Sequence, residues 1–435
     1  MMKPYRIFAL ATISLAAVLV SACGRTAVPA MTPQTQSHTA ASSSSETILH
    51  AFAGPEGAQP YTGALIEHGG NLFGTTEFGG TGDGVVYEVF RSAADALFTT
   101  PAIYTFRGGA DGAAPYAGLV ADAAGNFYGT TSSGGTGCLG IGCGTVFELS
   151  PAGASWKETV LYRFTGAADG SRPISTLAID GNGSLFGTAN AGGHCSGQTA
   201  YGTVFELSLA GGKAQFNLLH TFCGTSAGFR PAYAAPVIDK NGDLFATADG
   251  GTQGYGVVYE LTPSAQGPWK ETVLHDFTRA EGSPLITGLT MDGSGNLFGT
   301  GALGGTNDLG DVWELSPAGG SWKLSVLYNF QGGLDGSGPF SAPQLVNGKL
   351  YGTTYNGGTG GPCFHQCGTI YELSNANGQW TETVLYRFQS QSRSDGYNPI
   401  AAPLIDSAGN LFGTTTKGGG LKKSGTVYQF SLPAH

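Results

Sequence analysis

The stretch Asn71-Leu72-Phe73-Gly74-Thr75-Thr76 decides the fold, because its pattern recurs along the rest of the chain. The six later copies begin at Asn126, Ser184, Asp243, Asn296, Lys349 and Asn410. Successive copies start 53 to 61 residues apart. A repeat of roughly this period is typical of repeat architectures, in which each copy is one structural unit.

Three further patterns accompany each copy. One precedes it, as in 118–122 (GLVAD), one follows it, as in 84–89 (GVVYEV), and one separates successive units, as in 158–164 (ETVLYRF). All four patterns are short, rich in β-branched and aromatic residues, and bounded by glycine, which predicts strands. Four short strands in each unit are typical of a β-propeller blade.

The two ends of the repeat region predict how the ring closes. The region begins with a lone copy of the separating pattern at 46–52 and ends with the other three patterns at 401–431. The lone strand would complete the last blade and so remove the open edges of the ring. We therefore expect an all-β protein, a seven-bladed β-propeller over 46–435, with four-stranded antiparallel blades and 1+3 closure by the N-terminal strand.

The repeated motifs resemble those of the GloVer (Gloeo/Verruco-type) tandem-repeat family, a choice-of-anchor group of bacterial secreted and lipoprotein β-propellers. The resemblance rests on the Leu-Phe/Tyr-Gly-Thr-Thr, Gly-Gly-Thr and Gly-Thr-Val-Phe-Glu-Leu motifs and covers residues 46–431. The copy at Asp243 departs from it with Ala246 in place of the glycine, and the copy at Asn296 with Gly301 in place of the second threonine. The resemblance implies tandem repeats and surface anchoring, and it implies no established activity.

The N-terminus carries an export signal. Lys3 and Arg6 precede the apolar run 7–20, which is too short for a comfortable transmembrane helix. The run ends in Val-Ser-Ala-Cys, which resembles a bacterial lipobox. We expect a signal peptide over 1–22, a lipidated Cys23 and a flexible tether over 23–45. Cleavage as an ordinary secretory signal, there or after Ala30, is the alternative. The expected location is the bacterial cell envelope, at the outer membrane or cell surface, with membrane contact only through the lipid anchor.

Composition excludes several classes of protein. Charged residues make up 11% and aromatic residues 11%, so the chain is not a highly charged, disordered one. The net charge of −10 argues against a nucleic-acid partner, because nucleic-acid phosphates need lysine and arginine. Glycine supplies 73 of the 435 residues, and the repeats place much of it in turns, where it adopts backbone conformations open to few other residues.

Cysteine spacing predicts three disulfides. Besides the cysteine of the lipobox six remain, an even number that suits an oxidising compartment. Their places in shared loops, or at one face of a blade, favour the pairs Cys138–Cys143, Cys195–Cys223 and Cys363–Cys367. The alternative is a zinc site that includes His194 or His365, but the loops concerned belong to blades 2, 3 and 6 and are not expected to converge. We expect no metal and no cofactor.

Repetition separates structural residues from functional ones. A ring needs each blade contact seven times, whereas a catalytic site needs its residues once. We therefore assign three repeated carboxylate sets to structure: those of the third strand, those of the turn after the first strand, and those of the loops between blades (Glu88, Glu148, Glu206, Glu260, Glu314, Glu372; Asp122, Asp180, Asp239, Asp292, Asp406; Glu56, Asp111, Asp169, Glu281, Asp335, Asp395). Calcium binding at the turn aspartates is the alternative, although their spacing does not match an EF-hand loop.

The same filter applies to histidines and tryptophans. His50, His220 and His275 occupy a slot that other blades fill with tyrosine, which favours packing. Four tryptophans recur at the hairpins between the third and fourth strands, where packing is again favoured and sugar stacking is the alternative (Trp156, Trp269, Trp322, Trp380).

The residues that break the repeat are the candidate binding residues. Next to the prolines of the inter-blade loops they are Tyr61, Tyr116 and Phe340, together with Arg172 and Arg230 on neighbouring loops. His194 lies in a loop expected on the same face. Two arginines can clamp a carboxylate or sulfate, and the aromatic residues would suit an acidic sugar or peptide. The alternative is that both arginines are solvated and pair with nearby aspartates.

No catalytic set can be named, because repeated Ser, Thr and Asp residues supply too many chance partners. The sequence therefore favours a monomeric, non-enzymatic binding module for a glycan, an acidic ligand, a peptide or a protein partner. A carbohydrate-active enzyme, either a polysaccharide lyase or a hydrolase with its site at the channel mouth, is the alternative. His194, with the two arginines, is its candidate catalytic residue.

Overall fold

The computed structural model describes residues 39–40, 46–91, 102–135, 137–197, 200–224, 228–231, 233–264, 268–282, 287–358, 367–389, 395–420 and 424–432. The predicted signal peptide, Cys23, Cys363 and His365 lie outside these residues, as does most of the predicted tether. The anchor therefore stays a prediction. Everything below concerns the compact unit Ser37–His435.

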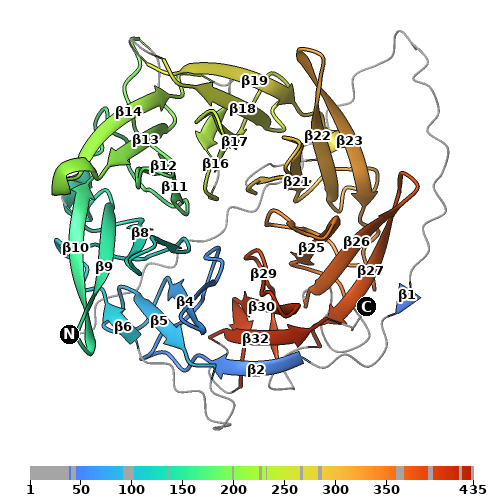
Figure 1. The fold of residues 1–435 in the computed structure, drawn as a ribbon, viewed down its shortest axis with the longest axis horizontal. Coiled ribbons are helices and arrows are strands. Elements are labelled where there is room, and N and C mark those ends of the chain that lie inside the picture. Colours follow the sequence, from blue (N-terminus) through green and yellow to red (C-terminus); the bar gives the residue numbers. More distant parts are fainter. Residues whose placement is uncertain are drawn as a thin grey trace. The chain divides into compact units, whose positions relative to one another are not determined.

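Seven sheets stand in a ring, and each is built on four antiparallel strands (Figure 1). The first strand of each blade lies nearest the centre and the fourth forms the outer wall. Blades 1 and 2 are β3 to β6 (Ile66–His68, Asn71–Thr76, Val85–Val89, Ala102–Thr105) and β7 to β10 (Val120–Ala121, Phe127–Thr131, Thr145–Ala152, Ser155–Arg163). Blade 3 is β11 to β14 (Ala178–Ile179, Leu185–Ala189, Thr203–Ser208, Gln215–Thr221) and blade 4 is β16 to β19 (Val237–Ile238, Leu244–Asp249, Val257–Thr262, Lys270–Asp276).

The remaining blades complete the predicted ring. Blade 5 is β20 to β23 (Thr290–Met291, Leu297–Gly301, Asp311–Ala318, Ser321–Asn329) and blade 6 is β24 to β27 (Gln344–Val346, Lys349–Thr354, Thr369–Ala376, Gln379–Arg387). Blade 7 is β29 (Leu404–Ile405), β30 (Asn410–Thr415), β32 (Thr426–Ser431) and β2 (Glu46–Ala51). The seven-bladed, all-β prediction is confirmed.

The ring closes as the ends of the repeat predict. Strand β2 pairs antiparallel with β32, with Ile48 opposite Tyr428. A second contact reinforces the junction of blades 7 and 1: the Arg91 Nη2 atom lies 2.8 Å from the Asp406 carboxylate, and its guanidinium lies 4.4 Å from the centre of the Phe412 ring. The closure therefore combines a strand ladder with one ion pair between blades.

The repeated glycine of the second strand makes room for a large ring on the third. A Cβ at Gly74 would lie 2.4 Å from the Tyr87 hydroxyl, and a Cβ at Gly299 would lie 2.3 Å from the Trp313 ring. Contacts as short as these cannot be accommodated unless the neighbouring aromatic side chain moves. The motif is thus explained by packing, since these aromatic side chains are fully buried.

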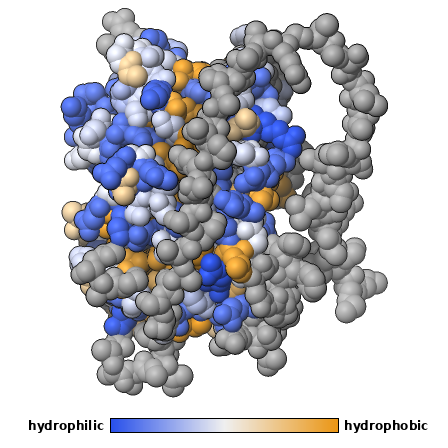
Figure 2. Space-filling model, turned by 90° about the vertical axis from the view of Figure 1, so that its right-hand side faces the viewer, coloured by the Kyte–Doolittle hydropathy of each residue, from blue (hydrophilic) through white to orange (hydrophobic). Residues whose placement is uncertain are grey.

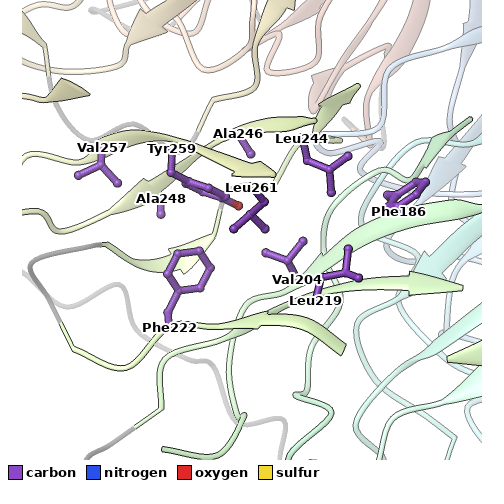
Figure 3. Close-up of a cluster of buried hydrophobic side chains, with 10 residues drawn as sticks. All are labelled: Phe186, Val204, Leu219, Phe222, Leu244, Ala246, Ala248, Val257, Tyr259 and Leu261. Carbon is purple, nitrogen blue, oxygen red and sulfur yellow. The ribbon is translucent and has the colours of Figure 1, made fainter. Parts of the chain in front are cut away.

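The hydrophobic core is divided among the junctions between blades. At the junction of blades 3 and 4, side chains from both blades interdigitate (Figure 3), including Phe186 and Val204 from one and Tyr259 from the other. The hairpin tryptophans extend these junctions: the Trp269 ring centre lies 6.2 Å from that of Phe186. The packing interpretation of the tryptophans is confirmed, as is that of the histidines, whose rings meet phenylalanines edge to face at 4.6 to 4.8 Å.

Several short elements differ from the prediction. Three single 3₁₀ turns occur where no helix was expected: η1 (Cys138–Gly140), η2 (Ala210–Gly212) and η3 (Arg279–Glu281). Strand β15 (Phe229–Pro231) pairs with β17, and β28 (Gly396–Tyr397) pairs with β31 (Lys417–Gly418). Strand β1 (Thr39–Ala40), within the predicted tether, lies parallel to β27, because an outer strand presents unpaired backbone groups.

Two of the three predicted disulfides lie within the described residues, Cys138–Cys143 and Cys195–Cys223. Cys367 is also disulfide-bonded, and Cys363 lies outside the described part of the chain. Disulfides persist in oxidising compartments, which indicates a protein outside the cytoplasm. Among the described residues no helix is long and apolar enough to cross a membrane.

Candidate functional site

The loops that connect successive blades hold a strained residue directly before proline. Six such residues have a left-handed backbone, with φ between 49° and 66° (Gln59, Ala114, Arg172, Arg230, Gly338, Asn398). A left-handed backbone is costly for residues other than glycine, and it persists only where its surroundings hold it. Arg172 and Arg230 therefore occupy one repeated backbone position, as their sequence positions predict.

Two hydrogen bonds hold the backbone of Arg172 in place. Its N–H donates to the Cys143 carbonyl at 2.8 Å, and its own carbonyl accepts from the Asn190 N–H at 3.1 Å. The Arg230 N–H likewise donates to the Tyr201 carbonyl at 2.8 Å. Both side chains are exposed, so the ring fixes the backbone of each arginine and leaves its guanidinium facing solvent. We call the side of the ring that carries these loops the loop face.

Aromatic residues of the loop face form two groups. Tyr61 and Tyr116 lie with ring centres 4.5 Å apart, and Tyr116 and Tyr233 with ring centres 5.8 Å apart. Phe340 instead meets Tyr355 edge to face at 5.5 Å. The structure thus brings two predicted residues, Tyr61 and Tyr116, together with Tyr233, which the sequence reasoning missed. It places the third predicted aromatic residue, Phe340, in a separate pair.

Tyr233 links the tyrosines to the two arginines. Burial raises the pKa of Tyr233, and the negative charge of Asp249 raises it further. The positive charges of Arg172 and Arg230 both lower this pKa, because both guanidiniums lie near the Tyr233 phenol. Burial, and a hydrogen bond and charge interaction with Tyr61, also raise the pKa of Tyr116. Tyr116 and Tyr233 therefore stay neutral and present aromatic faces and hydroxyls.

Two carboxylates join this group at the ends of second strands, and neither was predicted. Burial raises the pKa of Asp249 to about 6, although the charge of Arg230 opposes the shift. The Asp249 Oδ1 atom is buried and has no hydrogen-bond partner among the described residues. Burial also raises the pKa of Glu77, which lies beside Tyr116. We call Tyr61, Tyr116, Arg172, Arg230, Tyr233 and Asp249 the loop-face cluster.

Among the described residues, no hydrogen bond, ion pair or ring contact joins His194 to the cluster. It is exposed in the loop between β12 and β13, directly before the disulfide-bonded Cys195. No hydrogen bond or ion pair between described side chains connects it to Arg172 or Arg230. Its predicted role in binding or catalysis stays a prediction.

The repeated carboxylates hold turns and loops together. Asp122 Oδ1 accepts hydrogen bonds from the backbone N–H groups of Ala124 and Asn126, both at 2.9 Å. In the loop after β6, Asp111 accepts from the Tyr104 hydroxyl at 3.0 Å. The turn interpretation is confirmed for these acids. No group of three or more potential metal ligands occurs among the described residues.

The geometry of the loop-face cluster suits ligand binding. Two exposed guanidiniums can take an anion, and the partly exposed tyrosine rings can stack against an apolar face of a ligand. Asp249 is the one member of the cluster with a pKa moved close to neutrality, which is a property of binding and catalytic carboxylates alike.

Comparison with solved structures supports the fold alone. A putative 6-phosphogluconolactonase from Bacteroides uniformis is 13% identical, with a TM-score of 0.50 over 79% of this chain and 88% of that one. An ancestral GH74 enzyme is 11% identical, with a TM-score of 0.53 over 87% of this chain and 48% of that one. No curated protein matches the sequence.

The repeat motifs, in contrast, match a family along nearly the whole chain. The Gloeobacter/Verrucomicrobia repeat matches residues 31–246, 195–339 and 295–435. These spans cover all seven blades of the ring and include every residue of the loop-face cluster. The chain belongs to the Gloeobacter/Verrucomicrobia repeat family.

Proposed function

We propose that this protein is a non-enzymatic binding module that takes an acidic ligand at the loop-face cluster. The observation that carries the proposal is that Arg172 and Arg230 occupy the same left-handed position on two neighbouring inter-blade loops, with both side chains exposed and both charges acting on Tyr233. Each guanidinium offers several donors to a carboxylate or sulfate, and a pair on neighbouring loops can hold one anion from two sides. The rigid backbone at both positions limits the entropy lost on binding.

The proposal includes export and a lipid anchor. The two disulfides support an oxidising compartment, and the lipobox-like sequence at Cys23 supports attachment to the cell envelope, at the outer membrane or cell surface. A tether of about 20 residues would let the ring reach ligands away from the membrane. Glycans, peptides and proteins that carry acidic groups are then the accessible partners.

Binding of an array of anionic and neutral glycans and peptides by the wild type and by Arg172→Ala/Arg230→Ala tests the proposal. Each lost charge-assisted hydrogen bond is worth about 1.5–3 kcal/mol, so the double variant is expected to lose at least about 100-fold in affinity. Lys157→Ala/Lys323→Ala is the matched control, because it removes the same charge from exposed positions on the outer wall. Equal affinity of wild type and arginine variant for every acidic ligand would reject the proposal.

The enzyme alternative has one observation in its favour, which is the raised pKa of Asp249. A carboxyl group with a pKa of about 6 can act as a general acid or base near neutral pH. Chromatography of products after incubation with any ligand that binds would decide the matter. Turnover that disappears in Asp249→Asn or His194→Ala would establish an enzyme, whereas an unchanged ligand supports the binding module.

A further inference from the structure

The backbone of the loop face is already paired, which limits how a ligand can be recognised. In four blades the inter-blade loop forms an isolated antiparallel bridge with the loop that follows the second strand (Ala58–Phe78, Ala113–Ser133, Ser171–Ala191, Ser337–Asn356). In blade 7 the same two loops pair as β28 with β31, and in blade 4 the inter-blade loop pairs, as β15, with the end of the second strand β17. At blade 3, for example, the Ser171 N–H donates to the Ala191 carbonyl at 2.7 Å and the reverse bond measures 3.1 Å.

Side chains must therefore supply the recognition of a ligand at this face. Peptides that bind by strand addition need a free sheet edge, where main-chain hydrogen bonds supply the affinity. In the six blades just described, the corresponding backbone segments already bond to one another. The outer wall retains free edges, as the pairing of β1 with β27 illustrates, but these edges belong to the fourth strands and not to the loops of the cluster.

The tyrosines provide ring faces for a ligand with a C–H surface. Tyr61, Tyr116 and Tyr233 form a continuous row, with interplanar angles of 44° and 36° between neighbours, and all three are partly exposed. An aromatic face carries negative charge density and attracts the weakly positive C–H groups on one face of a pyranose ring. The hydroxyls of Tyr116 and Tyr233 stay protonated, since burial raises the pKa of both.

The charges of the cluster favour a ligand that carries both anions and hydroxyl donors. Arg172 and Arg230 attract anions, whereas Asp249, near Arg230, and Glu77, near Tyr116, repel densely charged polyanions such as sulfated polymers. The same two carboxylates can accept hydrogen bonds from hydroxyl groups. Asp249 Oδ1 has no partner among the described residues, so a hydroxyl could satisfy it after a small movement of the Asp249 side chain.

We infer that the acidic ligand is a carboxylated glycan, a polymer or oligomer of uronic acid sugars, with its carboxylates on Arg172 and Arg230 and a sugar face on Tyr116 and Tyr233. A uronic acid residue combines one carboxylate, several hydroxyls and a C–H face within one ring, which is the combination that the cluster offers. This inference rests on the proposed function, since it names the ligand class of the same site.

Calorimetric titration of the full chain with four probes tests the inference. The probes are polygalacturonate, its fully methyl-esterified and therefore uncharged form, poly-L-glutamate and dextran sulfate. We expect polygalacturonate to bind at least about 10-fold more tightly than each of the other three. We expect Arg172→Lys/Arg230→Lys to weaken the binding of polygalacturonate by about 10-fold, because lysine keeps the charge and lacks the planar set of donors that binds a carboxylate through two hydrogen bonds.

The aromatic part of the site is tested separately. Tyr116→Ala is expected to weaken the binding of polygalacturonate about 5–10-fold through loss of stacking, and Tyr116→Phe is expected to keep most of the affinity. Thermal melting checks that each variant retains the ring. Should Tyr116→Ala fail to fold, Tyr233→Ala replaces it, with Tyr233→Phe as its partner.

The outcomes separate the inference from the proposed function. If poly-L-glutamate or dextran sulfate binds as tightly as polygalacturonate, and does so through the arginines, the glycan assignment is wrong and the acidic-ligand module stands. If no probe binds in a manner that depends on Arg172 and Arg230, both are overturned. If the methyl ester binds as well as the free acid, the arginines do not read the carboxylate and the inference fails.

Discussion

Raising the pH is expected to weaken the closing strand β2, because its first residue is a buried carboxylic acid. Glu46 lies where blade 7 meets blade 6, and its Oε2 atom accepts a hydrogen bond from the Tyr386 hydroxyl at 2.9 Å. Burial raises the pKa of Glu46 to about 8; the bond from Tyr386 opposes this shift and the charge of Asp395 adds to it. The folded ring therefore holds a proton that the unfolded chain releases.

The sign and size of the effect follow from the difference between the two pKa values. The unfolded chain releases this proton near pH 4.5, so the contribution of Glu46 to stability is complete below that pH and is lost as the pH rises through about 8. The full loss is on the order of 4–5 kcal/mol. With an unfolding entropy of about 2.1 cal/mol/K per residue and about 390 residues in the ring, this corresponds to a fall in Tm of roughly 5 °C.

Thermal melts between pH 5 and 9, combined with hydrogen exchange of β2, measure this prediction. Glu46→Gln should reduce the alkaline fall in Tm by roughly 5 °C, since the amide does not ionise and keeps a similar shape. Glu314→Gln, on the third strand of blade 5, should leave the fall unchanged. A wild-type Tm that is constant from pH 6 to 9, or a Glu46→Gln variant with the wild-type slope, would refute the reasoning.

Three further predictions concern the closure, the disulfides and the arginine positions. Arg91→Ala removes the ion pair with Asp406 and the contact with Phe412, so chemical denaturation should report a loss of about 2 kcal/mol, and an unchanged midpoint would contradict the assigned role. Removal of Cys195–Cys223, whose cysteines have a sequence separation of 28, should cost about 3–4 kcal/mol, against about 2 kcal/mol for Cys138–Cys143, whose separation is 5. The reverse order of denaturation midpoints would contradict the loop-length argument. Arg172→Gly/Arg230→Gly should abolish binding of acidic ligands and leave the Tm equal or higher, because glycine adopts a left-handed backbone without strain. A fall in Tm would assign these arginines to structure.

The fold could be predicted from the sequence because the pattern of each of the four blade strands recurs seven times. A single strand pattern is weak, but copies with a common order leave few arrangements, and the lone strand at the N-terminus leaves one way to close the ring. Thr39–Ala40 could not be predicted in the same way, since a two-residue pairing with β27 uses only backbone atoms and has no side-chain pattern.

The candidate site could be predicted in part, and the limit has a physical cause. Arg172 and Arg230 stand next to prolines that mark a repeated loop, so their common face could be inferred from the sequence. Tyr233 and Asp249 lie outside the motifs, and only folding brings them to the arginines. A signal was present for Asp249, because it directly follows the six-residue repeat motif of a second strand, a position at which Glu77 and Tyr355 also stand and at which the repeat varies.

The left-handed position before proline allows a functional role of Arg172 and Arg230 to be weighed against a structural one. Blade 6 places glycine there, as Gly338, which shows that the loop needs no side chain at this point. A left-handed backbone at any other residue costs on the order of 1 kcal/mol or more, and Gln59, Ala114 and Asn398 carry the same cost in other blades, so the strain alone does not mark a functional residue. Blades 3 and 4 instead place arginine there, and both side chains are exposed. The Arg230 guanidinium lies 5.6 Å from the centre of the neighbouring Phe229 ring, whereas among the described residues no hydrogen bond, ion pair or ring contact holds that of Arg172. Binding therefore explains these two exposed guanidiniums better than packing does.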